Sequence, residues 1–471
     1  MSPVPRQSAH QRVARQQSDH RQPDHQQSAR QQFAQQQARR QQTLERLAQV
    51  LLGVSLVVSE LSRFTPARYL SLLLPLLFVG LLMTAGASRL SAARVPVPVL
   101  LFLAWIAASY VWSADPAHTV RSLLDVAWWA STALVAGLLL SLEQVRATVT
   151  RVVQGVLVLT VLVLVVAPGS STTPPEGDPA PGWHSIFDHK NGLGGFLILA
   201  FVTLALHRTR WRPVWLLVVL VLLVGSQSST ALGAVLFAGS LLLWRAGQQR
   251  IAVSGVRASV RVLSGMALGL LVVVATVVPT LLPSLLGRSG TLTGRTEIWA
   301  AVERQIGLHP LLGLGWGGAW TPASVPTLAM WREARFQAFY AHNGYLELLL
   351  QLGSVGALLF LALVGTACVR LVRHPDRRSA LWAGVVVLSL AVSAFSESSP
   401  FLGGGGGGLL LIVMFAVVAG QRSADPSGAP RTGTGGLGRP APVRTLRPST
   451  RGGPALVPAG PPPAPATSGW S

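Results

Sequence analysis

The chain has 471 residues, of which 50% are hydrophobic and only 12% are charged, whereas ordinary soluble domains carry roughly 25% charged residues. Apolar runs of about 16 to 20 residues recur along the chain, and a helix of that length can cross the hydrocarbon core of a bilayer. The composition therefore excludes an ordinary soluble domain and predicts an all-α, polytopic transmembrane bundle.

The net charge of +21 at first suggests nucleic-acid binding. However, about half of this charge lies in the two tails, and most of the rest lies in short loops between apolar runs, where basic residues specify membrane topology. We therefore expect no nucleic-acid partner. Cys368 is the only cysteine, so an intrachain disulfide and a cysteine-rich metal site are both excluded.

The two tails differ in composition from everything between them. Residues 1–43 are rich in Gln, Arg and Ser, and residues 421–471 are rich in Pro, Gly, Ala and Arg. Neither segment has enough large apolar residues to offset the entropy of folding, so both are expected to be disordered. No apolar segment typical of a cleavable signal peptide precedes residue 44, so the first span is expected to act as its own insertion signal.

Residues 44–420 form the expected membrane domain, with about twelve spans. In chain order these are residues 45–62, 69–86, 96–112, 122–141, 149–167, 191–207, 211–225, 229–245, 262–280, 343–369, 379–395 and 404–420. If the N-terminus is cytoplasmic, the inner loops hold roughly fifteen arginines and the outer loops only four basic residues. This asymmetry fits the positive-inside rule and places both termini in the cytoplasm.

Four polar segments then share the outer side of the membrane. They are residues 188–191, at the start of the sixth span, the turn 226–230, the long and partly helical loop 281–341 between spans nine and ten, and residues 396–399. Charged groups at membrane depth are costly, so Glu397 is expected to face a polar cavity rather than lipid. The common location of these segments predicts a functional site at the outer face.

His342 and Asn343 lie where the long loop returns to the membrane. The dipole at a helix N-terminus disfavours a protonated imidazole, and a neutral histidine there could accept a proton from a hydroxyl group. An interfacial histidine that merely solvates the start of the helix fits the same position.

Arg295 precedes an amphipathic stretch at residues 296–306, and its guanidinium suits bidentate phosphate binding. Glu297 could orient Arg295 or act as a base, although an ordinary helix start with Arg and Glu has the same pattern. Lys190, the only lysine, could meet a phosphate as a point charge, or could simply extend its charged end to the interface.

Residues 313–318 superficially suggest a nucleotide-binding loop, but they follow a His-Pro turn instead of a strand. We expect a turn that packs closely at the membrane surface. The outer segments have no pair of residues with metal-ligand spacing. We therefore expect no cofactor and a metal-independent mechanism in which Arg and Lys supply the positive charge. The run Gly403–Gly408 suggests close helix packing or a broken helix start.

Taken together, residues from about 188 to 397 resemble the O-antigen ligase/polymerase superfamily of bacterial membrane glycosyltransferases, which includes exopolysaccharide polymerases. The order of the motifs is more specific than any one of them. They are His189-Lys190-Asn191, Ser226-Gln227-Ser228, Gly294-Arg295 with Ile298-Trp299, Pro310 to Gly315, and His342-Asn343 with Tyr345-Leu346-Glu347.

The resemblance implies an inverting glycosyl transfer on the outer face of the bacterial plasma membrane. The donor would be a glycan linked to polyprenyl (undecaprenyl) pyrophosphate, and the acceptor a glycan, a lipid or the cell wall. His342 matches the family's usual base and Arg295 the arginine thought to hold the pyrophosphate. The other residues expected to bind substrate are His189, Lys190, Asn191, Ser228, Glu297, Asn343, Tyr345 and Glu397.

One position departs from the family pattern. Many relatives have Arg or Lys after the Ser-Gln-Ser motif, where this chain has Ser229. A second phosphate contact is then either missing or supplied by Lys190.

Two other classes of function compete with the enzyme. A transporter or flippase of lipid-linked glycans predicts polar residues through the whole membrane depth and paired broken helices, whereas this chain concentrates polarity at one face. A scaffolding protein of the cell envelope is supported only by the two tails. The sequence leaves polymerase and ligase open. Its preference for Arg over Lys suggests a high-GC host, and a Gram-positive one would lack lipopolysaccharide and favour polymerisation or another acceptor.

Overall fold

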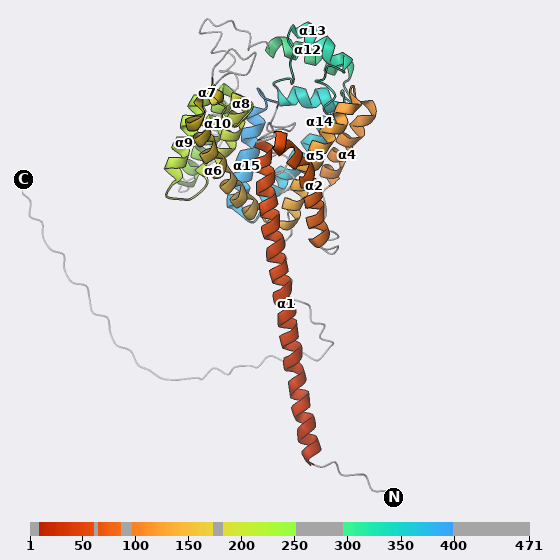
Figure 1. Ribbon diagram of the computed structural model, residues 1–471, viewed down its shortest axis with the longest axis vertical. Coiled ribbons are helices and arrows are strands. Elements are labelled where there is room, and N and C mark those ends of the chain that lie inside the picture. Colours follow the sequence, from red (N-terminus) through yellow and green to blue (C-terminus); the bar gives the residue numbers. More distant parts are fainter. Residues whose placement is uncertain (1–8, 61–64, 86–96, 173–181, 251–294, 399–471) are drawn as a thin grey trace, which may run out of the picture. The chain divides into compact units, whose positions relative to one another are not determined.

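The computed structural model describes residues 9–60, 65–85, 97–172, 182–250 and 295–398, and every regular element within these ranges is a helix (Figure 1). This confirms the all-α fold class for the described part of the chain. The helices are α1 (Ala9–Glu60), α2 (Thr65–Ala85), α4 (Val97–Ala108) with the 3-10 turn η1 (Ser109–Trp112), α5 (Pro116–Leu139), α6 (Leu142–Val166), α7 (Pro168–Thr172), α8 (Lys190–Ala205), α9 (Arg212–Ser226), α10 (Ser229–Arg250), α12 (Arg295–Leu308), α13 (Val325–Ala334), α14 (Gly344–Arg373) and α15 (Arg377–Ser393).

Ten of the twelve expected spans coincide with these helices. The other two, residues 262–280 and 404–420, lie outside the described residues, as do Gly403–Gly408 and the tail 421–471. Within the described ranges, α5, α6, α10 and α14 are long and apolar enough to cross a membrane, while α4 with η1, α8 and α9 are shorter apolar helices. The number of crossings, twelve, stays a prediction.

The first helix differs from the expected disorder of residues 1–43, because α1 begins at Ala9. Gln, Arg and Ala are good helix formers, and the helix continues without a break into the apolar residues of the first expected span. Side chains 30–43 are all exposed, and burial begins at Leu44. Local propensity rather than packing therefore accounts for this part of α1.

The helices pack through apolar faces into one extended core, and a second, smaller core lies between α12 and α13. α1 packs against α2, α5 and α6, whereas α8 contacts α6, α9, α10 and α15. The rings of Phe102 and Phe360, 5.6 Å apart, join α4 to α14. Trp382 of α15 is fully buried, and its Nε1 donates to the hydroxyl of Thr203 of α8 over 3.1 Å. Burial of such large side chains holds the scaffold on which the polar segments lie.

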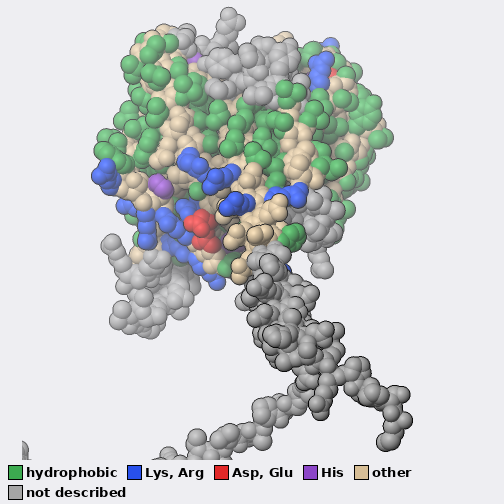
Figure 2. Space-filling model, turned by 60° about the horizontal axis from the view of Figure 1, so that its bottom comes forward, with side chains coloured by type: hydrophobic (Ala, Val, Ile, Leu, Met, Phe, Trp, Pro, Cys, Tyr) green, Lys and Arg blue, Asp and Glu red, His purple; other side chains and the backbone are tan. Residues whose placement is uncertain are grey.

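Basic residues mark one end of the bundle. Figure 2 shows Lys and Arg side chains gathered there, with hydrophobic side chains covering the flank. α14 connects this end to the opposite one, because it begins beside His342 and ends at Arg373. The polar segments and the basic loops therefore lie at opposite ends of the bundle, and which end faces the outside stays a prediction. The arginines are Arg146, Arg151, Arg208, Arg210, Arg212, Arg370, Arg373, Arg377 and Arg378.

α14 is broken at Gly353, whose φ of 65° is left-handed. A break leaves backbone groups without helical partners, and the preceding loop supplies new ones. The N–H of Leu314 donates to the carbonyl of Leu350 over 2.8 Å, and the N–H of Ser354 donates to the carbonyl of Pro310 over 2.9 Å. The loop is thereby fastened to the helix that begins after His342.

The glycine-rich turn at residues 313–318 packs closely, as expected. Gly315 has a φ of 87°, and an added Cβ would lie 2.7 Å from the Cα of Ser113. The backbone N–H groups of the four glycines all donate within the protein, to His309, Gln351 and Gly315. They are consequently not free to hold a phosphate, which excludes the nucleotide-loop interpretation.

Candidate functional site

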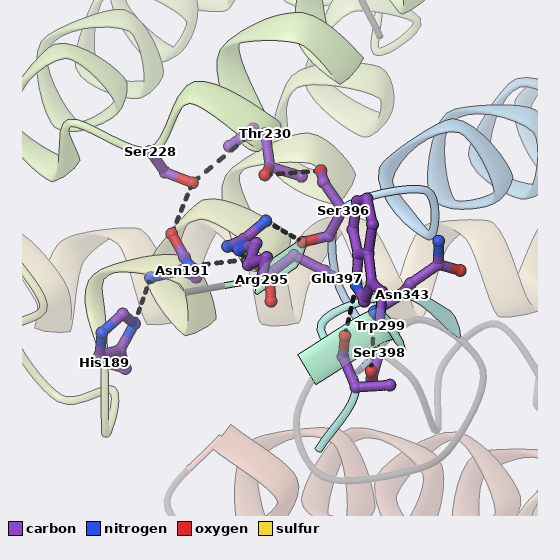
Figure 3. Close-up of polar contacts among 12 residues, drawn as sticks. His189, Asn191, Ser228, Thr230, Arg295, Trp299, Asn343, Ser396, Glu397 and Ser398 are labelled. Atoms are coloured by element: carbon purple, nitrogen blue, oxygen red, sulfur yellow. Dashed lines mark hydrogen bonds and ion pairs between the residues drawn. The ribbon is translucent and has the colours of Figure 1, made fainter. Parts of the chain in front are cut away.

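The polar segments meet at an ion pair between Arg295 and Glu397. Nη2 of Arg295 lies 3.3 Å from Oε1 of Glu397, and Nη1 donates to the carbonyl of Ser396 over 2.8 Å. Nδ2 of Asn191 donates to the same carboxylate oxygen over 2.7 Å, and the hydroxyl of Ser228 donates to Oδ1 of Asn191 over 3.0 Å. Figure 3 shows Asn191 lying between Ser228 and the ion pair.

Three of these side chains come from the beginnings of helices. Asn191 is in the first turn of α8, where Nδ1 of the N-cap His189 accepts the N–H of Asn191 over 3.2 Å. Ser228 follows Gln227, whose left-handed φ of 52° ends α9, and directly precedes α10. Arg295 begins α12. Helix N-termini carry partial positive charge, so this region favours an anionic ligand.

His342 lies next to this cluster in a strained backbone conformation, with a φ of 50°. Its Nδ1 is buried and has no hydrogen-bond partner among the described residues. Its ring centroid is 4.3 Å from that of Tyr340. A buried nitrogen without a partner is costly, and a substrate group could satisfy it.

The charge of His342 is set by its surroundings. Burial, together with the positive charge of Arg295 and a smaller electrostatic effect of His189, lowers the pKa of His342 to about 3. The imidazole is therefore neutral at pH 7, as expected from the sequence, but burial rather than the dipole of α14 is the main cause. The influence of Arg295 and His189 also means that all three side chains share one region.

Glu397 is the second group with a perturbed charge. Its side chain is almost completely buried, and this burial raises its pKa to about 7 although Arg295 acts in the opposite direction. Near neutral pH the carboxyl is therefore close to half protonated. Since a protonated carboxyl binds a guanidinium weakly, Arg295 can leave Glu397 and pair with a stronger anion at little cost in free energy.

Glu297 contacts its neighbour Thr296, and its expected contact with substrate stays a prediction. Its side chain is exposed, and its carboxylate accepts the hydroxyl of the adjacent Thr296 over 2.8 Å, which lowers the pKa of Glu297. Glu397 takes the place beside Arg295 that the sequence analysis gave to Glu297. The reason is tertiary: the segment after α15 meets the start of α12, a contact that sequence spacing does not reveal.

The remaining expected site residues lie around the cluster. Lys190 begins α8 and is half-buried, whereas Ser229 is exposed at the start of α10. Oδ1 of Asn343 caps α14 by accepting the N–H groups of Tyr345 and Leu346 over 3.0 and 3.2 Å. The hydroxyl of Tyr345 donates to the carbonyl of Ala391 over 2.9 Å, so it holds α14 to α15.

Sequence reasoning missed other members of the site. The hydroxyls of Thr230 and Ser396 share a hydrogen bond of 2.8 Å, and the hydroxyl of Ser398 accepts the N–H of Asn343 over 3.2 Å. All three lie in polar segments that the sequence singled out, so their position was the available signal. Nε1 of Trp299 donates to the carbonyl of Ala341 over 2.8 Å, which links α12 to the residue before His342.

Within the described ranges, no group of three or more His, Cys, Asp or Glu side chains could hold a metal ion. In this part of the chain, the positive charge of the cluster comes from Arg295 and from the helix N-termini that meet there, and Lys190 begins one of these helices.

Part of the chain is similar to known proteins. Residues 213–361 match the O-antigen ligase family, and the matched segment contains Ser228, Arg295 and His342. This segment is similar to the O-antigen ligase family. It is also 29% identical over 84 residues to the exopolysaccharide production protein ExoQ of Rhizobium meliloti (strain 1021), a match that covers 17% of this chain and 19% of that protein. The expected resemblance to the O-antigen ligase superfamily is thereby confirmed, and the apolar helices with this family point to a membrane protein.

Proposed function

We propose that the protein is an integral membrane glycosyltransferase that polymerises or ligates a polyprenyl-pyrophosphate-linked glycan on the outer face of the bacterial plasma membrane. Both termini would lie in the cytoplasm. The observation that carries the proposal is that the helix begun by Arg295 is joined to the residue before His342, since Nε1 of Trp299 donates to the carbonyl of Ala341 over 2.8 Å. The charge of Arg295 accordingly acts on the pKa of His342. One side chain suits a pyrophosphate, and the other is a neutral base.

The donor half of the reaction falls to the cations of the site. As the bond between the anomeric carbon and the pyrophosphate oxygen breaks, negative charge develops on the leaving group. Arg295 is fixed at the start of α12 and can stabilise this charge without moving far. On donor binding, Arg295 releases the half-protonated Glu397 and pairs with the pyrophosphate. Lys190 acts as a second cation, because the basic residue of the family pattern is absent at Ser229. Since these groups supply the positive charge, we propose a metal-independent reaction.

The acceptor half needs a base. The acceptor hydroxyl attacks the anomeric carbon from the side opposite the pyrophosphate, and His342 takes the hydroxyl proton. A pKa of about 3 makes His342 a weak base, but the acceptor oxygen becomes strongly acidic as its new bond forms. The arriving pyrophosphate also offsets the charge of Arg295, which moves the pKa of His342 back towards its ordinary value. Transfer of this proton contributes about 10²–10⁴ in rate.

The test is reconstitution of the purified protein in liposomes with a polyprenyl-pyrophosphate oligosaccharide. We expect new glycosidic bonds from the wild type and a rate at least about 100-fold lower from His342→Ala or Arg295→Ala. The matched controls are His309→Ala, an exposed histidine of the same loop, and Arg304→Ala, an exposed arginine of α12. Wild-type product from both site variants would overturn the mechanism. Transbilayer movement of the donor without bond formation would instead identify a transporter.

A further inference from the structure

A second carboxylate, Glu347, lies one turn into α14 and is 1% exposed. Its Oε1 accepts Nε1 of Trp320 over 2.6 Å and Nε2 of Gln351 over 2.7 Å. Its Oε2 accepts the backbone N–H of Ala341 over 2.6 Å and the hydroxyl of Ser398 over 3.2 Å. Burying a carboxylate is expensive, so four donors for one side chain call for an explanation.

The partners of Glu347 surround the backbone of His342. Ala341 is the residue before His342, and its N–H is held directly by Glu347. Asn343 is the residue after it, and its N–H donates to the hydroxyl of Ser398, which in turn donates to Glu347. The residues on both sides of His342 are therefore linked to the same carboxylate, Ala341 directly and Asn343 through Ser398.

This fixation matters because of the backbone conformation of His342. A residue other than glycine with a φ of 50° is strained by roughly 1–2 kcal/mol, and such strain persists only where the surroundings determine the conformation. The imidazole direction follows from that φ. Without the two flanking contacts, the segment could relax to a negative φ and turn the ring away from Arg295.

The hydrogen bonds also specify the chemical form of the side chain. Three of the four partners, the indole of Trp320, the amide nitrogen of Gln351 and the N–H of Ala341, can only donate. A glutamine would place its NH₂ group against at least one of these donors. The arrangement thus requires an oxygen acceptor at both positions, which glutamic acid provides and glutamine does not.

We infer that Glu347 is the positioning residue of the reaction, which holds His342 in its left-handed conformation and aims its ring at the acceptor hydroxyl. The inference rests on the proposed function. Glu347 itself touches neither donor nor acceptor, so its loss slows the chemical step and leaves donor binding by Arg295 unchanged.

The experiment is a double-mutant cycle in reconstituted liposomes. We expect Glu347→Gln to lower kcat about 10- to 100-fold with the donor KM within about twofold, as for a 1 Å misplacement of a reacting group. In a His342→Ala background, Glu347→Gln should have no further effect, because it acts only through that side chain. The matched control is Glu303→Gln, an exposed glutamate of α12, which should retain the wild-type rate.

Ser398→Ala provides a second variant if Glu347→Gln does not fold. It removes only the hydroxyl that links Asn343 to Glu347, and we expect a loss of about 3- to 10-fold in kcat alone, from loss of one ordinary hydrogen bond. A wild-type rate for both variants, while His342→Ala is at least about 100-fold slower, would overturn the inference and leave the proposed function intact. A further loss in the His342→Ala background would also overturn it, because Glu347 would then serve folding. A wild-type rate for His342→Ala would instead refute the proposed function.

Discussion

Replacing Arg295 by Ala tests the electrostatics of the ion pair, because the loss of stability should depend on pH. The pKa of Glu397 is about 7 with Arg295 present and rises further once the guanidinium is gone. The folded variant then keeps its proton on Glu397 where the folded wild type has released it. The free energy of unfolding therefore falls further below the wild-type value as pH rises through 7.

The magnitude follows from the pKa of Glu397. Ionisation of this group stabilises the folded wild type by at most roughly 0.1 kcal/mol at pH 6, about 0.4 kcal/mol at pH 7 and about 1.4 kcal/mol at pH 8. The Arg295→Ala variant loses this stabilisation of the folded state at each pH. It also removes the hydrogen bond to the Ser396 carbonyl, which adds about 1 kcal/mol at every pH.

The assay is thermal unfolding in detergent micelles at pH 6, 7 and 8, with each variant compared with the wild type at the same pH. Arg304→Ala is the control, because its pair with Glu333 is exposed and contributes little. In a Glu397→Gln background, Arg295→Ala should lose its pH dependence. An equal loss at pH 6 and pH 8, or a pH-dependent loss that survives in the Glu397→Gln background, would refute this reasoning.

Three further outcomes are expected. Donor binding to the wild type, measured with a fluorescent polyprenyl pyrophosphate, should weaken from pH 6 to pH 8 as Glu397 ionises and competes for Arg295. Glu397→Gln should remove this pH dependence. The same dependence of donor affinity on pH in both proteins would contradict a competition between Glu397 and the donor. Gly353→Ala should destabilise the protein by at least about 1 kcal/mol, because φ is 65° and the new Cβ would meet the backbone of Leu311. The control is Gly365→Ala in the same helix, which should leave stability unchanged because its new Cβ would lie in open space. EDTA should leave product formation unchanged, and a loss reversed by added Mg²⁺ would contradict a reaction neutralised by Arg and Lys.

The sequence predicted the helices well because their cause is local. A continuous apolar segment in lipid can form all its backbone hydrogen bonds only as a helix. Accordingly, α5, α6 and α14 lie close to the predicted ranges. The start of α1 was missed because low hydrophobicity was taken as disorder, although a chain rich in Gln, Arg and Ala can continue a helix that is anchored further along.

The site was predictable in its location but not in its contacts. Topology alone grouped Asn191, Ser228, Arg295 and Glu397 at one end of the bundle, and the structure brings these four into one network. The pairing of Arg295 with Glu397 depends on how two distant segments pack, and sequence spacing favoured Glu297 instead.

Two features of the site had no usable sequence signal. The left-handed conformation of His342 carries no signature in a non-glycine residue, because it is imposed by neighbouring contacts. Glu347 was visible within the motif after His342, but its four donors come partly from Trp320 and Ser398, which are distant in sequence. Its role could therefore be inferred only from the folded structure.

The most direct test of the central claim is glycosidic bond formation by His342→Ala in liposomes, with donor affinity measured on the same sample. The account predicts a fall in product formation of at least about 100-fold, with donor affinity within about twofold of the wild type because Arg295 is intact. Wild-type product formation by His342→Ala would contradict the assignment of His342 as the base.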